Sequence, residues 1–151
     1  MSPTWAKMSA PLYNTDILRL ATSIPHHERL ADPDASVERR SATCGSRVTV
    51  DVRMDEAGNI ADLGLEVRAC ALGQASASLM AANAVGQNVD ALLQARDKLA
   101  AYLAGTDDDL AFWPGLSVLA PARDYPARHA SIRLSFDAVA QAAADAVKAD
   151  V

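Results

Sequence analysis

The sequence contains few cysteines and few aromatic residues. Cys44 and Cys70 are its two cysteines, and Trp, Tyr and Phe together make up 5% of the 151 residues. Two cysteines without a hydrophobic secretory segment argue against a disulfide-rich secreted scaffold, and we therefore expect a cytoplasmic protein. So few aromatic rings offer no stacking platform for single-stranded nucleic acid.

An excess of positive charge and a long apolar run are also missing. The chain has 14 Lys and Arg residues against 19 Asp and Glu residues, which gives a formal net charge of −5. A non-specific nucleic-acid binder needs a basic face to displace counterions from phosphates. No apolar stretch approaches the roughly 20 residues that cross a bilayer. We therefore expect neither a nucleic-acid partner nor a membrane partner.

Sequence motifs of common enzymes are absent. Ser76 and Ser78 lack the Gly-x-Ser-x-Gly context of a nucleophile elbow, and no phosphate-binding loop or dinucleotide fingerprint occurs. The three consecutive aspartates at 107–109 lack the alternating spacing of a calcium-binding loop. The sequence therefore does not predict an enzyme.

Half of the residues are hydrophobic, which is enough for a sizeable core. Hydrophobic residues make up 50% of the chain, and a chain of this length is expected to fold as one domain. Residues 1–11 contain Pro and Ser with little periodicity and are expected to form a flexible arm. The domain is then expected to span residues 12–151.

Alternation of apolar and polar residues predicts an antiparallel meander. The pattern is strict over 47–54 and resumes over 60–68 after a hairpin loop, and a weaker strand is predicted over 37–43. A short helix over 12–23, with Asn14 or Thr15 as its cap, is predicted before the sheet. The strands therefore form a three-stranded sheet with one face to bury.

The chain beyond Cys70 is predicted to be mostly helical. We expect helices over 72–85 and 89–103, a short helix that starts at Thr106 and the aspartates 107–109, an irregular or briefly helical stretch over 114–126, and a last helix with apolar residues from 132 to 147. The predicted fold class is α+β: a three-stranded antiparallel meander with helices packed on one face and flanking N-terminal and C-terminal helices.

The meander topology brings the two cysteines to the same end of the sheet. Cys44 lies in the turn between the first two predicted strands, and Cys70 follows the third strand and precedes a helix. A helix N-terminus favours the thiolate form that metal binding and sulfur transfer require. The alternative interpretation is that both cysteines act as small hydrophobic residues.

Two motifs around these cysteines resemble a known family. The sequence SATCGS at 41–46, a strand hairpin, and ACALGQASASL at 69–79 together resemble the IscU/NifU N-terminal family of iron-sulfur cluster assembly scaffolds. In that family, a CGD turn and a GCxxxxASxS segment each provide a ligand cysteine. The resemblance extends from about residue 12 to residue 147, and the longer segment before 125–128 is more similar to the SufU branch. It implies the IscU/SufE-like fold.

The chain departs from this family at two ligand positions. Ser46 stands in place of the CGD aspartate, and no third cysteine occurs at the start of the last helix. Aligning the preceding proline places the missing thiol at Ser131, whereas aligning His129 with the family's His-Cys pair places it at Ala130. Neutral serine hydroxyls bind iron and zinc weakly, so neither Ser46 nor Ser131 replaces the lost ligand well.

The resemblance implies that Cys44 and Cys70 bind iron or an iron-sulfur cluster, with zinc as an alternative. His129 is a candidate third ligand, and the fourth is left to water, Ser46, a small thiol or a second protomer. A cluster with so few protein thiolates should be labile. The alternative to direct ligation is that the thiols accept sulfur.

The resemblance also implies protein partners. A cysteine desulfurase and apo-protein acceptors are expected, and the arginines at 39–40 and 123–133 could form a docking surface for an acidic partner. Two other functions stay open: a metal-free interaction or regulatory module that keeps the scaffold fold, and a persulfide sulfur-relay protein. An oligomer is compatible with any of these functions.

Overall fold

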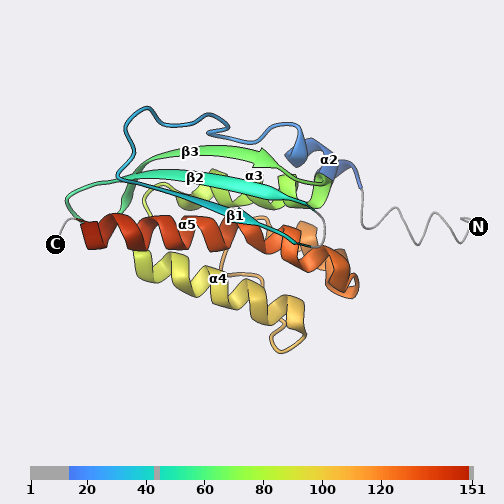
Figure 1. The fold of residues 1–151 in the computed structure, drawn as a ribbon. Helices are drawn as coiled ribbons and strands as arrows, with labels where there is room; N and C mark the ends of the chain where they lie inside the picture. Colours follow the sequence, from blue (N-terminus) through green and yellow to red (C-terminus); the bar gives the residue numbers. More distant parts are fainter. Residues whose placement is uncertain (1–13, 43–44, 150–151) are drawn as a thin grey trace, which may run out of the picture.

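The computed structural model describes residues 14–42 and 45–149 (Figure 1). The predicted flexible arm at 1–11 lies outside the described residues. The helices are α2 (Thr15–Ala21), α3 (Ala71–Ala84), α4 (Val89–Ala104) and α5 (His129–Ala149), the strands are β1 (Ala35–Arg40), β2 (Arg47–Met54) and β3 (Ile60–Arg68), and the 3-10 helices are η1 (Leu116–Asp124) and η2 (Pro126–Arg128). The predicted α+β class and the antiparallel meander are confirmed, because the strands pair in the order β1-β2-β3.

Strict alternation in β2 and β3 gives the sheet one apolar face. Val48, Val50 and Val52 of β2 are fully buried against the helices, and Leu63 and Leu65 of β3 are buried as well. The bounds of β2 and β3 agree with the predicted 47–54 and 60–68. The first strand begins two residues earlier than predicted, because pairing with β2 already starts at residue 35.

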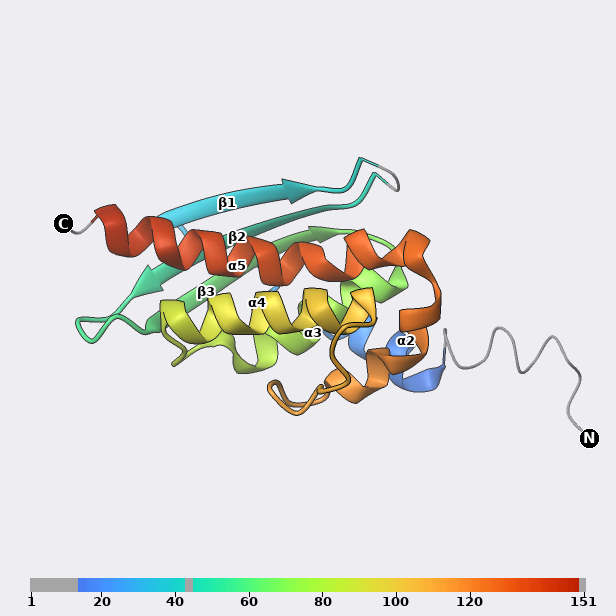
Figure 2. The same cartoon turned by 90° about the horizontal axis from the view of Figure 1, so that it is seen from below.

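Helices α3, α4 and α5 form two layers beneath this apolar face. Figures 1 and 2 show α3 and α5 against the sheet and α4 on the side of α5 that faces away from it. Because α5 is sandwiched, its residues are buried on more than one side, including Phe136 and Val139. Its small alanines allow the sheet and α4 to approach closely; Ala138, Ala140, Ala142, Ala143 and Ala146 are all buried.

The helix ends follow the predicted capping residues. Asn14 accepts a hydrogen bond from the Ile17 N–H at the start of α2, and Asn88 accepts one from the Ala91 N–H at the start of α4. Gly105 closes α4 in the left-handed conformation, with φ of 84°. In the described part of the chain, no helix combines the length and apolar character that crossing a bilayer requires.

The predicted short helix at 106–109 is wrong. The Thr106 hydroxyl donates to the carbonyl of Ala101 and so helps to close α4 instead of starting a new helix. Asp107 and Asp109 accept hydrogen bonds from N–H groups two residues ahead, which fixes successive turns in an irregular loop. Local side-chain bonding therefore replaces the helical conformation that the N-terminal charge pattern favours.

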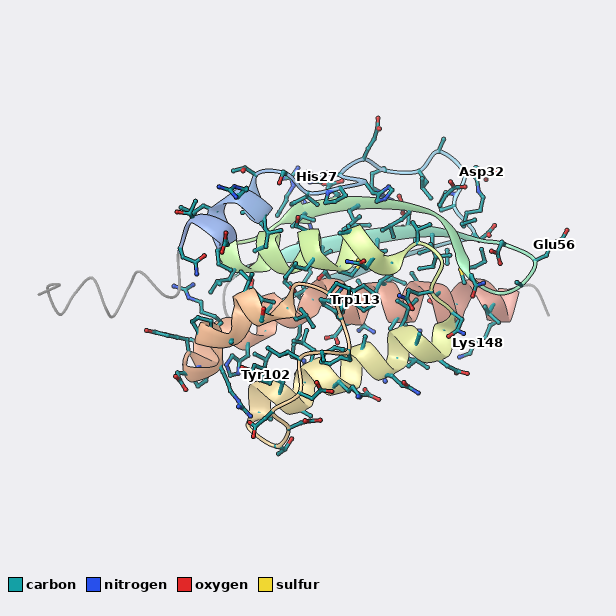
Figure 3. All side chains as sticks on the ribbon, turned by 180° about the vertical axis from the view of Figure 1, so that it is seen from behind. His27, Asp32, Glu56, Tyr102, Trp113 and Lys148 are labelled. Carbon is teal, nitrogen blue, oxygen red and sulfur yellow. The ribbon has the colours of Figure 1, made fainter. Side chains whose placement is uncertain are left out.

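Trp113 holds this irregular loop against the core. Its indole Nε1–H donates to the carbonyl of Leu79 over 2.8 Å, and its ring meets Phe136 edge to face at a centroid distance of 5.2 Å. Figure 3 marks the position of Trp113. The side chain is buried. A buried indole with its N–H satisfied is a strong tertiary anchor, which fixes the path between α4 and η1.

A loop covers part of the polar face of the sheet. The N–H of Leu65 donates to the carbonyls of His26 and Glu28, so the segment 26–30 runs along the free edge of β3. At Gly64 this segment comes so close that a Cβ would lie 2.5 Å from the Glu28 carbonyl oxygen. Glycine at this strand position is therefore required by close backbone packing.

The same loop buries Asp51, which the alternation of β2 places on the polar face. The Arg29 guanidinium donates to both Asp51 carboxylate oxygens, at 2.7 and 3.1 Å, and the Leu30 N–H and the Ser36 hydroxyl also donate to this carboxylate. The carboxylate of Asp51 is fully buried. Asp51 therefore ties the covering loop to β1 and β2.

Candidate functional site

Cys70 lies at the junction between the sheet and the helical layer. It lies two residues after Arg68, the last residue of β3, and is the N-cap residue of α3, with an extended backbone at φ −65° and ψ 170°. Its side chain is half-buried, and no side chain caps the first turn of α3. The first-turn N–H groups of α3 therefore have no side-chain acceptor, and such groups are general binding partners for anions.

Two serines complete a small polar cluster with Cys70. The thiol of Cys70 lies 3.5 Å from the hydroxyl of Ser131, which in turn lies 2.7 Å from the hydroxyl of Ser46. Ser46 and Ser131 are 3% and 1% exposed. Because water has little access to them, their two hydroxyls form a hydrogen bond with each other. The cluster joins three segments that are distant in sequence: the β1–β2 turn, the start of α3 and the start of α5.

The β1–β2 turn delivers Ser46 through local backbone bonds. The Ser41 N–H donates to the Ser46 carbonyl, the Gly45 N–H donates to the Ser41 carbonyl, and Gly45 adopts a positive φ of 66°. Cys44 belongs to this turn but lies outside the described residues. The predicted arrangement of two thiols at one end of the sheet is therefore described only for Cys70.

The structure distinguishes the two alignments that the resemblance leaves open at the start of the last helix. Ser131 is buried and contacts Cys70, whereas Ala130 is exposed. A thiol in place of the Ser131 hydroxyl would face Cys70. The geometry thus favours position 131 as the equivalent of the family's third cysteine.

His129 lies at the start of α5, and its ring is hydrogen-bonded to the end of η1. Its Nε2 lies 3.1 Å from the Ala122 carbonyl oxygen and 2.9 Å from that of Arg123, so this nitrogen acts as a donor. Metal ligation would have to use Nδ1. Within residues 14–42 and 45–149, no three His, Cys, Asp or Glu side chains gather closely enough to hold a metal ion.

Gly73 and Ser76 let α3 approach the start of α5 and were not predicted to belong to the site. A Cβ at position 73 would lie 2.9 Å from the Ser131 hydroxyl and 2.7 Å from the Ala69 Cβ. One turn further on, the buried Ser76 hydroxyl donates to the Ile132 carbonyl over 2.6 Å. Small residues three apart on one helix face were the available signal, since this spacing allows close helix contacts.

Alanine at position 73 should destabilise the protein, although alanine normally favours a helix by about 1 kcal/mol over glycine. Its Cβ would push Ser131 away from Cys70, and overpacking of this kind costs about 1–3 kcal/mol. Thermal unfolding of Gly73→Ala should therefore show a lower Tm than wild type. Gln74→Ala, at a half-buried neighbouring position, is the matched control; a Tm increase in Gly73→Ala would contradict the close packing.

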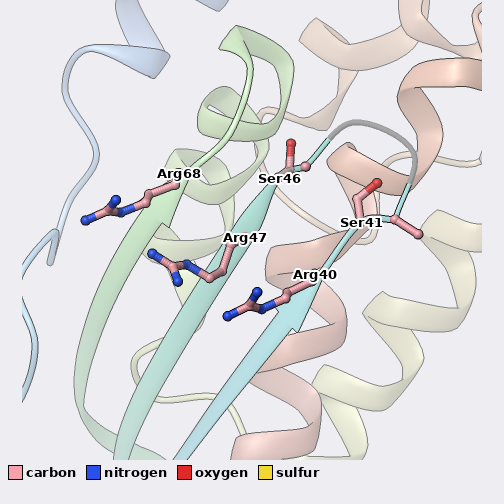
Figure 4. A pocket seen from close by; sticks show the side chains of 7 residues that line it. Arg40, Ser41, Ser46, Arg47 and Arg68 are labelled. Carbon is pink, nitrogen blue, oxygen red and sulfur yellow. The ribbon is translucent and has the colours of Figure 1, made fainter.

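A surface cavity of about 510 Å³ opens beside the serine cluster (Figure 4). It lies at the same end of the sheet as Ser46 and contains guanidinium groups from all three strands. Its lining consists of Arg40, Ser41, Ala42, Gly45, Ser46, Arg47 and Arg68. An anionic group could therefore approach the end of the sheet where Cys70 lies.

The fold and the comparisons place the chain in a class of proteins, the iron-sulfur cluster assembly scaffold family to which IscU, SufU and NifU-like proteins belong. The chain belongs to the NifU-like N terminal domain family, whose sequence model matches residues 12–130. The resemblance inferred from the two cysteine motifs is confirmed.

Individual relatives agree with this assignment. The chain is 26% identical over 117 residues to the iron-sulfur cluster assembly scaffold protein IscU of Thermotoga maritima. The aligned region covers 78% of this chain and 82% of the relative. It is 40% identical to the N-terminal part of a nitrogen-fixing NifU-like protein from Brucella abortus, with a TM-score of 0.86 and coverage of 93% and 98% of the two chains.

A more distant structure shares the fold. A protein assigned as the iron-sulfur cluster assembly scaffold of the SUF system in Fervidobacterium islandicum is 21% identical, with a TM-score of 0.79 and coverage of 89% of this chain and 98% of that one. Scaffolds of the IscU/NifU family bind iron-sulfur clusters in general, are generally not enzymes, and generally work with a cysteine desulfurase and acceptor proteins.

Proposed function

We propose that this protein is an iron-sulfur cluster scaffold or carrier that holds iron or a labile cluster, or accepts sulfur, through Cys44 and Cys70. It acts in the cytoplasm, receives sulfur from a cysteine desulfurase and passes its cargo to apo-proteins. The observation that carries the proposal is the contact between the Cys70 thiol and Ser131, which is itself bonded to Ser46. The three segments that bear the family's ligand positions therefore converge.

The donor set of this chain suits weak and reversible binding. Thiolates are the preferred ligands of iron-sulfur clusters and also bind zinc well, whereas the neutral hydroxyls of Ser46 and Ser131 are poor ligands. Two cysteines leave a four-coordinate site incomplete, so His129 through Nδ1, a small thiol or a second protomer has to complete it. A cargo held in this way should transfer readily to an acceptor that offers more thiolates.

Sulfur acceptance requires only one reactive thiolate. The Cys70 thiolate would attack the outer sulfur of the donor's persulfide, forming a new sulfur–sulfur bond while the donor's cysteine leaves as a thiolate. The product is a persulfide on Cys70, with no net oxidation or reduction. The first-turn N–H groups of α3, which have no side-chain cap, would stabilise the negative charge on the attacking and product sulfur.

Anaerobic reconstitution tests the proposal. The purified chain is incubated with ferrous iron, cysteine, a cysteine desulfurase and dithiothreitol, which supplies the electrons that reduce persulfide sulfur to sulfide, and is then examined by visible absorption and metal analysis. A parallel sample without iron and dithiothreitol is examined by mass spectrometry, and zinc is tested in a third sample. We expect absorption from a bound cluster that is lost in Cys44→Ala and in Cys70→Ala. Unchanged circular dichroism and Tm in these variants would exclude unfolding as the cause of the loss.

The same experiment separates the alternatives. A mass increase of one sulfur without bound iron would support the sulfur-relay role within the proposal. If wild type gains neither a metal nor sulfur, the proposal fails, and a metal-free interaction or regulatory module becomes the better interpretation. Retention of the full signal in both cysteine variants would also contradict it.

A further inference from the structure

Three arginines form a row across the end of the sheet that is nearest to Cys70. Arg40 at the end of β1 lies opposite Arg47 at the start of β2, and Arg47 lies opposite Arg68 at the end of β3. Figure 4 shows the three guanidinium groups projecting in the same direction from neighbouring strands. Like charges directly opposite each other on adjacent strands are unfavourable, so the Arg–Arg pairs themselves do not stabilise the sheet.

Neighbouring glutamates only partly neutralise the row. Glu38 lies 3.0 Å from Arg40 and 3.4 Å from Arg47, and Glu66 lies 3.4 Å from Arg68 and 3.9 Å from Arg47. Two carboxylates for three guanidinium groups leave one net positive charge at this place. The side chains of Arg40 and Arg68 are 67% and 70% exposed, so their remaining donors face solvent.

Two of the other candidate docking arginines, Arg123 and Arg133, lie close to carboxylates of the same chain. Arg123 pairs with Asp108 at 2.6 Å and lies over the ring of Tyr102, and Arg133 lies 4.0 Å from Asp137 one helical turn away. The row, in contrast, lines the cavity that also contains Ser46. Among the arginines that the sequence suggests for docking, only Arg40 belongs to this row. Arg47 and Arg68 complete the row and were not predicted.

We propose that the arginine row, Arg40, Arg47 and Arg68, docks an acidic segment of a partner protein and thereby directs that partner to the Cys70 end of the sheet. The proposal rests on the proposed function for the identity of the reaction served. Three adjacent strands span roughly 10 Å, a distance that two or three acidic side chains of one peptide can match. Guanidinium groups bind carboxylates through paired hydrogen bonds, which fixes orientation as well as position.

The charge of the whole chain favours a protein partner over nucleic acid. With a formal net charge of −5, the molecule as a whole repels polyphosphates, and the row supplies only three cations. The same net charge weakens non-specific attraction of an acidic partner to the chain as a whole. Local attraction at the row therefore favours one orientation of the partner.

Binding to a defined acidic peptide tests the docking surface. A fluorescent 12-residue peptide of alternating Glu and Ala is titrated with the metal-free chain at low ionic strength, and anisotropy is measured. Arg40→Glu and Arg68→Glu should each weaken binding about threefold or more, and the double variant about tenfold. The control is Arg53→Glu, at the opposite end of the same face beside Asp62, which should leave the affinity unchanged.

Other ligands define the results that would overturn the docking proposal. A Gln-for-Glu peptide, inorganic phosphate and a single-stranded oligonucleotide are tested as competitors. Competition by phosphate or the oligonucleotide at or below the concentration of the acidic peptide would instead indicate a small-anion or nucleic-acid site. Equal binding by wild type and the double variant would also refute the proposal.

A second measurement separates docking from cluster loading. In the Arg40→Glu and Arg68→Glu double variant, iron loading with a desulfurase as the sulfur source should slow by a larger factor than iron loading with inorganic sulfide. If the arginine variants lose peptide binding but the wild-type protein takes up neither iron nor sulfur, the docking proposal is supported and the proposed function fails. Unaltered desulfurase-dependent loading would mean that the row does not serve this site.

Discussion

Cysteine at position 131 should increase the affinity for ferrous iron or zinc by about 100-fold or more and prolong the lifetime of a bound cluster. The Ser131 hydroxyl already lies 3.5 Å from the Cys70 thiol, so a sulfur at this position would point at the same cargo. The change replaces a weak neutral ligand with a thiolate. Competition with a chromophoric chelator measures the affinity, and the decay of visible absorption measures the cluster lifetime.

Ala130→Cys is the matched control for this gain. Position 130 lies one residue earlier in the same helical turn but is exposed, so its thiol would project away from Cys70. We expect little change in metal affinity for this variant. A larger gain at 130 than at 131 would show that the other alignment is the functional one, and no gain at either position would contradict shared ligation with Cys70.

Alanine at position 51 should lower the free energy of unfolding by about 3 kcal/mol, which corresponds to a Tm decrease of roughly 6–12 °C. The buried Asp51 carboxylate accepts hydrogen bonds from Arg29, Ser36 and the Leu30 N–H, and all three donors would lose their acceptor. Asp62→Ala is the control. The exposed Asp62 carboxylate forms one ion pair, with Arg53 at 3.8 Å, and should contribute little to the free energy of unfolding. Urea unfolding of both variants tests the difference.

The contribution of Asp51 should also depend on pH. Burial by itself would raise its pKa, but hydrogen bonds from Arg29, Ser36 and the Leu30 N–H outweigh this effect and hold the pKa of the carboxyl below its ordinary value. The stabilisation is therefore complete above the ordinary value of about 4 and is lost as the pH falls through the lower value of the folded protein. The stability gap between wild type and Asp51→Ala should narrow as the pH is lowered from 7 toward 3. An unchanged gap over this range would contradict the assignment.

Local patterns predicted most of the fold, because the elements with regular alternation or clear caps form as expected. The valines at 48, 50 and 52 determine the register of β2, and Asn88 and Gly105 bound α4. The predicted short helix that starts at Thr106 is wrong because Thr106 closes the preceding helix instead. Its hydroxyl donates to the carbonyl of Ala101, five residues earlier. The burial of Asp51 was not predictable, since it depends on a loop that folds over the sheet.

The candidate site was predictable only in part. Placing Cys70 at the end of the sheet requires nothing beyond strand direction, and the sequence motifs identify the family. The bond between Ser46 and Ser131 joins residues 85 positions apart, and no local pattern reports it. The role of Gly73 is equally hidden, because a glycine in a helix is significant only when the neighbouring segment is known.

The hydroxyl of Ser131 next to Cys70 has a consequence for oxidative damage. A second thiol at this distance would give the empty site a partner for disulfide formation, whereas a serine cannot be oxidised in this way. Cys70 is the only free thiol that the described residues provide. Ser131 itself therefore cannot trap Cys70 in a disulfide, so a sulfenic acid on Cys70 has to react with another thiol, either a small thiol or Cys44.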